Sequence, residues 1–230
     1  MISISLSDAI NLVRANLDEL DNNGSIMYND EGGSSADMVD NRSLDDLIAH
    51  FLPEAINAVN KAAPVALLEG DSATPSSIST ITGDTKVLAF ELPDSSDFLR
   101  LVAFKAKDSA IVVTDAIPEA SAEGRKQQNQ YIRGRADRPR LVLMQGSQDG
   151  TPKFRYYSLA TGTPSPTAAG TIDTLLILKE VKYSDSATSY SGCQRLRQNY
   201  IDYTTARIME TYNDARAQSY YQKAASYDAV

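Results

Sequence analysis

The sequence predicts an α+β protein in which helices from both ends of the chain form a bundle that carries an inserted antiparallel β-sandwich or barrel domain. Three observations indicate this class. Apolar residues recur at helical spacing before about residue 70, short extended segments follow, and the stretch from residue 193 onward contains neither Gly nor Pro. We therefore assign residues 1–70 and 184–230 to the helical bundle and residues 75–183 to the inserted β-domain.

The first predicted helix begins near the amino end of the sequence, where Ser5 or Ser7 can cap it. Its apolar face is formed by residues that alternate between spacings of four and three: Leu6, Ile10, Val13, Leu17 and Leu20. Residues 22–41 are rich in Asn, Asp, Gly and Ser, which predicts a long exposed loop after this helix.

The second predicted helix starts at Ser43, which opens an S-x-x-D capping pattern, and its apolar face continues to Val59. Pro53 lies inside it. Because Pro lacks the backbone N–H that an interior helical position donates, we expect Pro53 either to kink this helix or to split it into two.

The extended segments predict the strands of the β-domain. Residues 78–82 and 85–91 flank Gly83-Asp84, a two-residue link typical of a β-hairpin. A short helix is expected over residues 119–131 and a turn-rich loop over residues 161–170. The other predicted strands cover residues 98–105, 110–114, 140–145, 154–159 and 171–182.

A single long helix is predicted from residue 193 to residue 230, and most of the tyrosines lie in or just before it. Tyrosine combines a large apolar ring with a polar tip, so these rings can either pack within the bundle or cover a partner. For the end of the chain we favour a partner contact, with these candidate residues: Tyr212, Arg216, Tyr220, Tyr221 and Tyr227.

The chain is acidic, with 22 Lys and Arg against 30 Asp and Glu and a net charge of −8. A protein that grips DNA needs a surplus of cations, so this balance disfavours DNA binding. One basic cluster stands out, and we interpret it as a contact between subunits or with an acidic partner rather than with nucleic acid. Its members are Arg125, Lys126, Arg133, Arg135, Arg138 and Arg140, with Glu123 and Asp137 among them.

No set of residues predicts catalysis, a metal or a cofactor. Cys193 and His50 are the only residues of their kinds, which excludes an intramolecular disulfide and most zinc sites, and favours a reducing compartment. His50 is expected to be a half-buried structural residue, and no nucleotide-binding or G-x-S-x-G motif is present. The paired acids are explained by a helix first turn, at Asp45-Asp46, and by a turn, at residues 94–97.

The amino-terminal residues resemble no signal peptide, and the apolar runs are too short to cross a bilayer. We therefore expect a soluble protein, made in a cytoplasm and without a membrane partner.

Two stretches taken together resemble a known family. Leu92 to Phe104 reads L-P-D-S-S-D-F-L-R-L-V-A-F, a turn followed by a strand that is apolar apart from Arg100; the polar, Gln-rich run from Gln127 to Pro139 then enters a second strand. This order resembles the ring-forming head–tail connector (adaptor) proteins of short-tailed bacteriophages, most closely those of crAss-like phages. The Ser95-Ser96 spacer and the loop over residues 22–41 depart from the family's pattern.

The resemblance implies a non-enzymatic virion protein, assembled in the host cytoplasm, that forms a twelvefold homo-oligomeric ring at the head–tail interface. Such a ring joins the portal to the next ring or tail protein, and DNA passes through its lumen without specific binding. The subunit contacts would fall on the β-domain, at Arg125 to Arg140, and the portal contact on residues 212–230. The alternatives are a monomeric β-module that binds a ligand or glycan in a concave aromatic pocket and, third, an enzyme.

Overall fold

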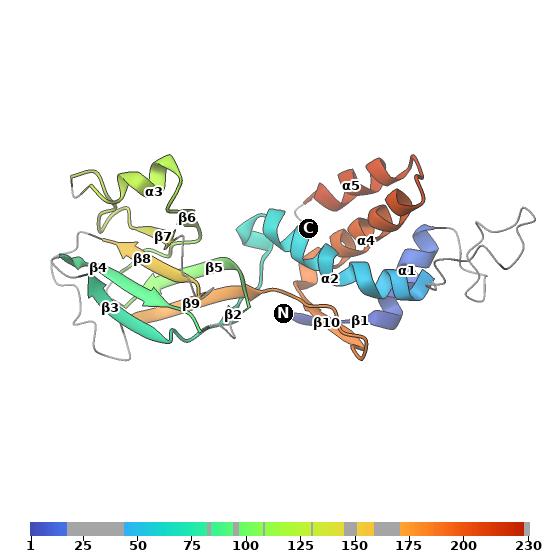
Figure 1. The fold of residues 1–230 in the computed structure, drawn as a ribbon, viewed down its shortest axis with the longest axis horizontal. Helices are drawn as coiled ribbons and strands as arrows, with labels where there is room; N and C mark the ends of the chain where they lie inside the picture. Colours follow the sequence, from blue (N-terminus) through green and yellow to red (C-terminus); the bar gives the residue numbers. More distant parts are fainter. Residues whose placement is uncertain are drawn as a thin grey trace, which may run out of the picture. The chain divides into compact units, whose positions relative to one another are not determined.

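The computed structural model describes residues 1–17, 44–81, 84–93, 97–107, 109–129, 131–144, 151–158 and 171–227. Helices and strands alternate in blocks, which confirms the predicted α+β class (Figure 1). The chain divides into two compact units. The helical unit comprises Met1–Glu69 together with Val181–Val230, and the β unit comprises Gly70–Glu180.

The helical unit is made from both flanking parts of the chain. Its core is formed where α1, α2 and α4 pack together, with Val13, Ile48 and Ile201 all buried. Two short strands, β1 and β10, pair antiparallel and were not predicted. In chain order the elements are β1 (Ile2–Ser5), α1 (Leu6–Asn16), α2 (Leu44–Ala62), the 3-10 turn Val65–Leu67, β10 (Ser189–Gly192), the 3-10 turn Gln194–Leu196, α4 (Arg197–Thr211) and α5 (Ala217–Ala225).

Helix α1 begins where the sequence predicts. Ser5 is its N-cap, and the Ser5 hydroxyl accepts a hydrogen bond from the backbone N–H of Asp8 at 3.4 Å. The helix ends at Asn16, with Val13 completely buried. The predicted last residue of its apolar face, Leu20, lies outside the described residues.

Helix α2 is one continuous helix that contains Pro53, so the predicted alternative of two helices is wrong. An interior Pro removes one hydrogen bond and costs about 3 kcal/mol in an isolated helix. Here Pro53 is itself buried, next to Leu52 and close to Ile56, and packing of this face offsets the lost bond. The predicted cap, Ser43, lies outside the described residues.

The single long helix predicted over residues 193–230 is wrong, because the chain breaks between α4 and α5 and the two helices lie side by side (Figure 1). The break is at Asn213, which has a positive φ of 55°. Its N–H donates to the carbonyl oxygen of Glu210 at 3.0 Å, and the N–H of Asp214 donates to that of Met209 at 2.8 Å. This pair of bonds is the Schellman motif that ends helices, with Asn in the left-handed position.

A substitution at Asn213 tests this helix stop. Asn213→Ala is expected to lower the free energy of unfolding by about 1 kcal/mol, because a residue with a Cβ is strained at positive φ. Asn213→Gly, the matched variant, should be neutral or stabilising. Urea denaturation followed by circular dichroism measures both. Equal stability of the Ala and Gly variants would contradict the assignment of a left-handed stop at this residue.

The β unit contains two sheets. The five-stranded sheet has the order β3-β4-β8-β7-β6, and the three-stranded sheet has the order β2-β9-β5. The elements are β2 (Asp71–Ser72), β3 (Ser77–Ile81), β4 (Asp84–Glu91), β5 (Phe98–Ala106), β6 (Ala116–Pro118), α3 (Ala122–Lys126), β7 (Arg140–Met144), β8 (Lys153–Tyr157) and β9 (Ile172–Lys179). All pairs are antiparallel except β6 with β7, which is parallel, so the expectation of an entirely antiparallel domain is wrong at this edge.

Most predicted strands of the β unit are present, with three differences. Residues 110–114 form no strand, because only Val113 pairs, in a single bridge to Phe104. The helix expected over residues 119–131 is reduced to the five residues of α3. Strands β3 and β4 pair antiparallel as predicted, but residues 82 and 83 between them lie outside the described residues.

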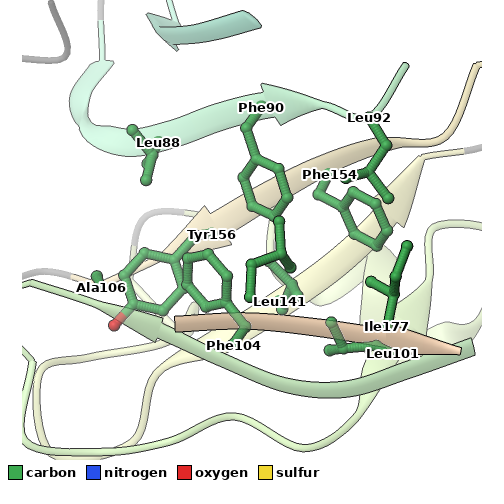
Figure 2. Close-up of a cluster of buried hydrophobic side chains, with 11 residues drawn as sticks. Leu88, Phe90, Leu92, Leu101, Phe104, Ala106, Leu141, Phe154, Tyr156 and Ile177 are labelled. Carbon is green, nitrogen blue, oxygen red and sulfur yellow. The ribbon is translucent and has the colours of Figure 1, made fainter. Parts of the chain in front are cut away.

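One hydrophobic cluster of the β unit receives side chains from both sheets (Figure 2). The Phe90 ring stacks on Phe104 of the three-stranded sheet at 5.1 Å and on Phe154 of its own sheet at 5.0 Å between ring centroids. All three rings are fully buried, and so is Ile177 of β9. The faces of the two sheets therefore share a single core.

Polar side chains tie the two chain portions of the helical unit together. The Asn57 amide donates to the carbonyl oxygen of Val181 at 2.8 Å and accepts from the N–H of the same residue at 2.9 Å. Deeper in the unit, the Tyr200 hydroxyl donates to the Asn60 side-chain oxygen at 2.7 Å and accepts from the N–H of Cys193 at 3.0 Å. These bonds join the helix before the inserted β unit to the segment that follows it.

Candidate functional site

The segment between β6 and β7 carries the predicted basic cluster, and close backbone contacts anchor it to the sheet. Ser121 caps α3 by accepting a hydrogen bond from the N–H of Gly124 at 3.0 Å. A side chain at Gly124 would collide with the carbonyl oxygen of Pro118. A Cβ at Gly134 would lie 2.6 Å from the carbonyl oxygen of Tyr157, so only glycine allows this approach.

Gln127 closes the segment into a loop. Its side chain is buried, accepts a hydrogen bond from the N–H of Gly134 at 2.7 Å and donates to the carbonyl oxygen of Glu123 at 3.2 Å. A buried amide that loses its hydrogen-bond partners costs free energy, so both bonds are expected to persist. They attach the Gln127 side chain to Glu123 on one side of the loop and to Gly134 on the other. Gln127 and Gly134 both belong to the Gln-rich run that the sequence singled out.

Two apolar side chains project from this anchored loop. Tyr131 is 75% exposed and Ile132 is 58% exposed, and we call them the exposed pair. The Asn129 side chain accepts a hydrogen bond from the N–H of Tyr131 at 3.0 Å, and its carbonyl accepts from the N–H of Ile132 at 3.2 Å. The backbone under the exposed pair is therefore held by hydrogen bonds, whereas the rings and methyl groups remain in water.

After the exposed pair, the chain makes a tight hairpin in which Arg135 and Arg138 lie directly opposite each other. The N–H of Arg138 donates to the carbonyl oxygen of Arg135 at 2.9 Å, and the reverse bond is 3.2 Å long. Both side chains are exposed. Like charges directly opposite each other are unfavourable, so this pair favours an anionic neighbour.

A groove of about 710 Å³ lies beside this hairpin. One wall is the irregular stretch that follows β5, where Val112 is 48% exposed, and the other wall includes the chain that enters β7. The lining residues are Ile111, Val112, Val113, Thr114, Asp115, Ile117, Pro118, Glu123, Asp137, Arg138, Pro139 and Arg140. Apolar side chains, acids and arginines thus meet in one open depression, and the described residues of its lining include no aromatic one.

Five members of the basic cluster, our candidates for the contact between subunits, have different environments. Arg125 donates to the carbonyl oxygen of Ala120 at 2.9 Å and 3.1 Å, and Lys126 forms an ion pair with Glu123 at 3.5 Å, both on the surface. Arg133 is buried and interacts with a neighbouring group. Arg135 and Arg138 share the hairpin, and Arg138 also lines the groove.

Two of the predicted portal-contact tyrosines form hydrogen bonds within the helical unit, and the portal contact itself stays a prediction. The Tyr220 hydroxyl donates to the carbonyl oxygen of Asn16 at 3.2 Å, and the Tyr221 hydroxyl donates to Glu210 at 2.6 Å. Tyr212 and Tyr227 are half-buried.

Among these candidates Arg216 is the exposed one, at the start of α5. Its guanidinium donates to the Asp214 carboxylate at 2.8 Å and 3.0 Å. This contact holds the pKa of Asp214 below its usual value, through the side-chain hydrogen bond first. Arg216 is therefore exposed, but its charge is partly neutralised by Asp214 of the α4–α5 turn.

The contact between Tyr221 and Glu210 makes the packing of α5 pH-dependent. Burial, and then the hydrogen bond to Glu210, raises the pKa of Tyr221 from 10.0 to about 12. The same hydrogen bond, followed by that from Arg207, lowers the pKa of Glu210 from 4.5. The contribution of Tyr221 is complete below pH 10 and is lost as the pH rises to about 12. The contribution of Glu210 is complete above pH 4.5 and is lost as the pH falls through its lowered pKa.

A titration of tyrosine-labelled protein by nuclear magnetic resonance measures this coupling. We expect Tyr221 to titrate near pH 12, and Glu210→Gln to move that midpoint toward 10, because the carboxylate that disfavours the tyrosinate is removed. Asp214→Asn, which removes a nearby carboxylate that makes no contact with Tyr221, is the control and should leave the midpoint in place. An unchanged midpoint in the Gln variant would contradict the coupling.

The residues considered for catalysis do not converge. His50 is exposed rather than half-buried, and its ring contacts those of Phe51 and Tyr183 edge-on. Asp45 accepts two hydrogen bonds from Arg14, in the first turn of α2 where it was predicted. Over the described ranges, no three His, Cys, Asp or Glu residues cluster closely enough to hold a metal ion. Asp94 lies outside those ranges.

In the part of the chain that the structure describes, no helix combines the length and apolar character that a membrane span requires.

No protein-family model matches the chain, and no curated protein is significantly similar to it.

Sequence reasoning identified the basic cluster but missed the exposed pair and the groove. The groove depends on long-range contacts, since it joins residues 111–118 to residues 137–140. One local signal was present: Tyr131-Ile132 is an apolar dipeptide between a Gln-rich and an Arg-rich stretch, with no apolar repeat of either helix or strand around it. Such a dipeptide has no core to join and is therefore a candidate for an exposed contact.

Proposed function

We propose that this chain is a non-enzymatic structural protein of a tailed-bacteriophage virion, which forms an oligomeric ring at the head–tail junction and connects the portal to the tail while DNA passes through. In this proposal the helical unit is a bundle that carries the β unit as an inserted β-sandwich. The protein acts by surface complementarity, and no bond is made or broken.

The observation that carries the proposal is the discontinuous helical unit. Met1–Glu69 and Val181–Val230 fold together, and the β unit is inserted between them. In the ring-forming connectors that the sequence resembles, a helical bundle formed by the two ends of the chain carries an inserted β-domain, which is the same order of parts. The two hydrogen bonds between Asn57 and Val181 lie where the chain returns from the β unit to the helical unit. They hold the two portions of the helical unit together, which supports the proposal of a bundle with an inserted domain.

The β unit is the proposed contact between neighbouring copies. Its anchored loop presents Tyr131 and Ile132 to solvent, and the Arg135–Arg138 hairpin adds two exposed cations. Aromatic residues and Arg are enriched in protein interfaces because they bury large areas and pair with carboxylates.

The helical unit is the proposed portal side, at the end formed by the α4–α5 turn and α5. Truncation after Tyr212 does not test this contact cleanly, because it would remove α5, whose Ala224 is buried and whose Tyr221 bonds to Glu210. Arg216→Glu is the sharper variant: it reverses an exposed charge and leaves the rest of the helix in place. We expect it to weaken portal binding without loss of folded protein.

The experiment for the proposed function is a copy count in purified phage particles. Quantitative mass spectrometry with labelled peptides of this chain and of the portal protein should find several copies per particle, because a ring is built from repeated copies of one chain. The family resemblance implies twelve. Absence from the particles, or a single copy per particle, would refute the proposal.

A ligand-binding β-module is the second candidate, and the groove of about 710 Å³ is the observation that favours it. Its volume is within the range of small-molecule sites. The lining contains no aromatic side chain, however, and sugars are commonly bound by stacking on aromatic rings. A glycan is therefore the less favoured ligand for this module.

A further inference from the structure

The exposed pair and the groove are two apolar surfaces of the β unit that remain uncovered in a single folded copy. Tyr131 and Ile132 are the two most exposed of the large apolar side chains among the described residues. Neither residue lines the groove, so a single copy leaves its own groove open. Exposing apolar surface to water is unfavourable in free energy. This holds both for the large apolar side chains of the exposed pair and for the apolar walls of the open groove.

We propose that the exposed pair of one copy inserts into the groove of a second copy of this chain, so that the β units join head to tail. This inference rests on the proposed function, because it names the contact through which the ring closes. A head-to-tail contact uses two different surfaces of each copy, and repeating it generates a ring or a filament rather than a closed dimer.

The shapes and chemistry of the two surfaces match. The groove of about 710 Å³ has room for two side chains, and its walls include Ile111, Val112 and Pro118, against which a ring and a branched aliphatic chain can pack. Val112, at 48% exposed, is the third most exposed large apolar residue and lies inside the groove. Insertion would cover Tyr131, Ile132 and Val112 together.

The charges match as well. Within the described ranges, Asp115 and Asp137 of the groove are exposed and form no ion pair, and Arg135, close to the exposed pair, is likewise an exposed cation without a carboxylate partner. Docking the loop of one copy on the groove of another brings Arg135 toward such acids. Charge pairs of this kind select the register of an interface.

The anchoring of the loop makes the insertion favourable. The buried Gln127 and the close approach at Gly134 hold the backbone under the exposed pair before any partner binds. A preorganised segment loses less conformational entropy on docking than a mobile one.

The test measures self-association of the full chain by sedimentation velocity over a range of concentrations. The loop variant is Tyr131→Ser with Ile132→Ser, the groove variant is Val112→Asp, and the control is Leu12→Ser, an exposed apolar residue of α1. We expect the loop variant and the groove variant each to weaken self-association about 100-fold, and the control to behave as wild type, with all three keeping the wild-type circular dichroism spectrum.

A mixture of the loop variant and the groove variant distinguishes this contact from self-association through another surface. The loop variant keeps its groove and the groove variant keeps its exposed pair, so an equimolar mixture should form 1:1 dimers that grow no further. A loop variant that assembles like wild type, a mixture that remains monomeric, or a wild-type chain that stays monomeric at every concentration would each overturn the inference. The copy count in particles is independent of these outcomes, so a ring made through another surface would refute the inference and leave the proposed function standing.

Discussion

Replacing Phe90 with Ala is expected to lower the free energy of unfolding by about 3–5 kcal/mol, the usual cost of removing a buried phenyl ring. Phe90 is buried and stacks on both Phe104 and Phe154, one from each sheet. Its loss therefore opens a cavity at the centre of the core that the two sheets share (Figure 2). Urea denaturation followed by circular dichroism measures the loss.

Hydrogen exchange shows where the Phe90→Ala effect falls. Peptides from β4, β5 and β9 should lose protection, because these strands line the cavity. Thr74→Ala, at an exposed position in the same unit, is the control and should change stability by less than about 0.5 kcal/mol. A loss below about 1 kcal/mol for the Phe90 variant would mean that the two sheets do not share one core.

Replacing Tyr200 with Phe is expected to cost about 2–4 kcal/mol, although only one oxygen atom is removed. The Tyr200 hydroxyl is bonded to both Asn60 and the N–H of Cys193 in a buried position. Without it, the Asn60 oxygen loses a donor and the Cys193 N–H loses its acceptor, where water cannot replace them. The substitution weakens the connection between α2 and the segment that returns from the β unit.

The matched control for this variant is Tyr131→Phe, which removes the same atom from a ring that is 75% exposed. The control should be neutral in chemical denaturation. Hydrogen exchange in the Tyr200 variant should rise in α2 and α4, the helices that the hydroxyl joins. If both variants were equally stable, the hydroxyl would contribute nothing to the connection.

The elements that the sequence predicts well are those whose signal is local. Val13 and its neighbours repeat at helical spacing and form α1, and the apolar face of α2 continues past Pro53 because packing outweighs one missing hydrogen bond. Strands β5, β7 and β9 have apolar runs of the expected length.

The elements that were missed depend on partners distant in sequence or on a single backbone angle. β1 and β10 are four residues each and are strands only because they pair with each other. Residues 110–114 are rich in β-branched residues, as strands are, but only Val113 forms a bridge, and residues 111–114 line the groove. The stop at Asn213 needs positive φ, which Asn tolerates but does not require, so the same sequence without Gly or Pro was interpreted as one helix.

For the candidate site, residue type alone did not separate inward from outward side chains. Tyr221, a candidate for a partner contact, bonds through its hydroxyl to Glu210 in its own unit, and Arg133 of the basic cluster is buried. Tyr131, which was noted only as part of the Gln-rich run, is 75% exposed, more than any other large apolar side chain among the described residues. A folded loop, held by Gln127 and Gly134, decides which of these side chains faces solvent.

The most direct test of the central claim, that copies of this chain assemble into a ring, is an electron cryomicroscopy reconstruction of the head–tail junction of the phage particle. We expect a closed ring of identical copies below the portal, with neighbouring β units in contact and Tyr131 of each covered by the next. Density at the junction that cannot be fitted by this chain, or isolated copies located elsewhere on the particle, would contradict the claim.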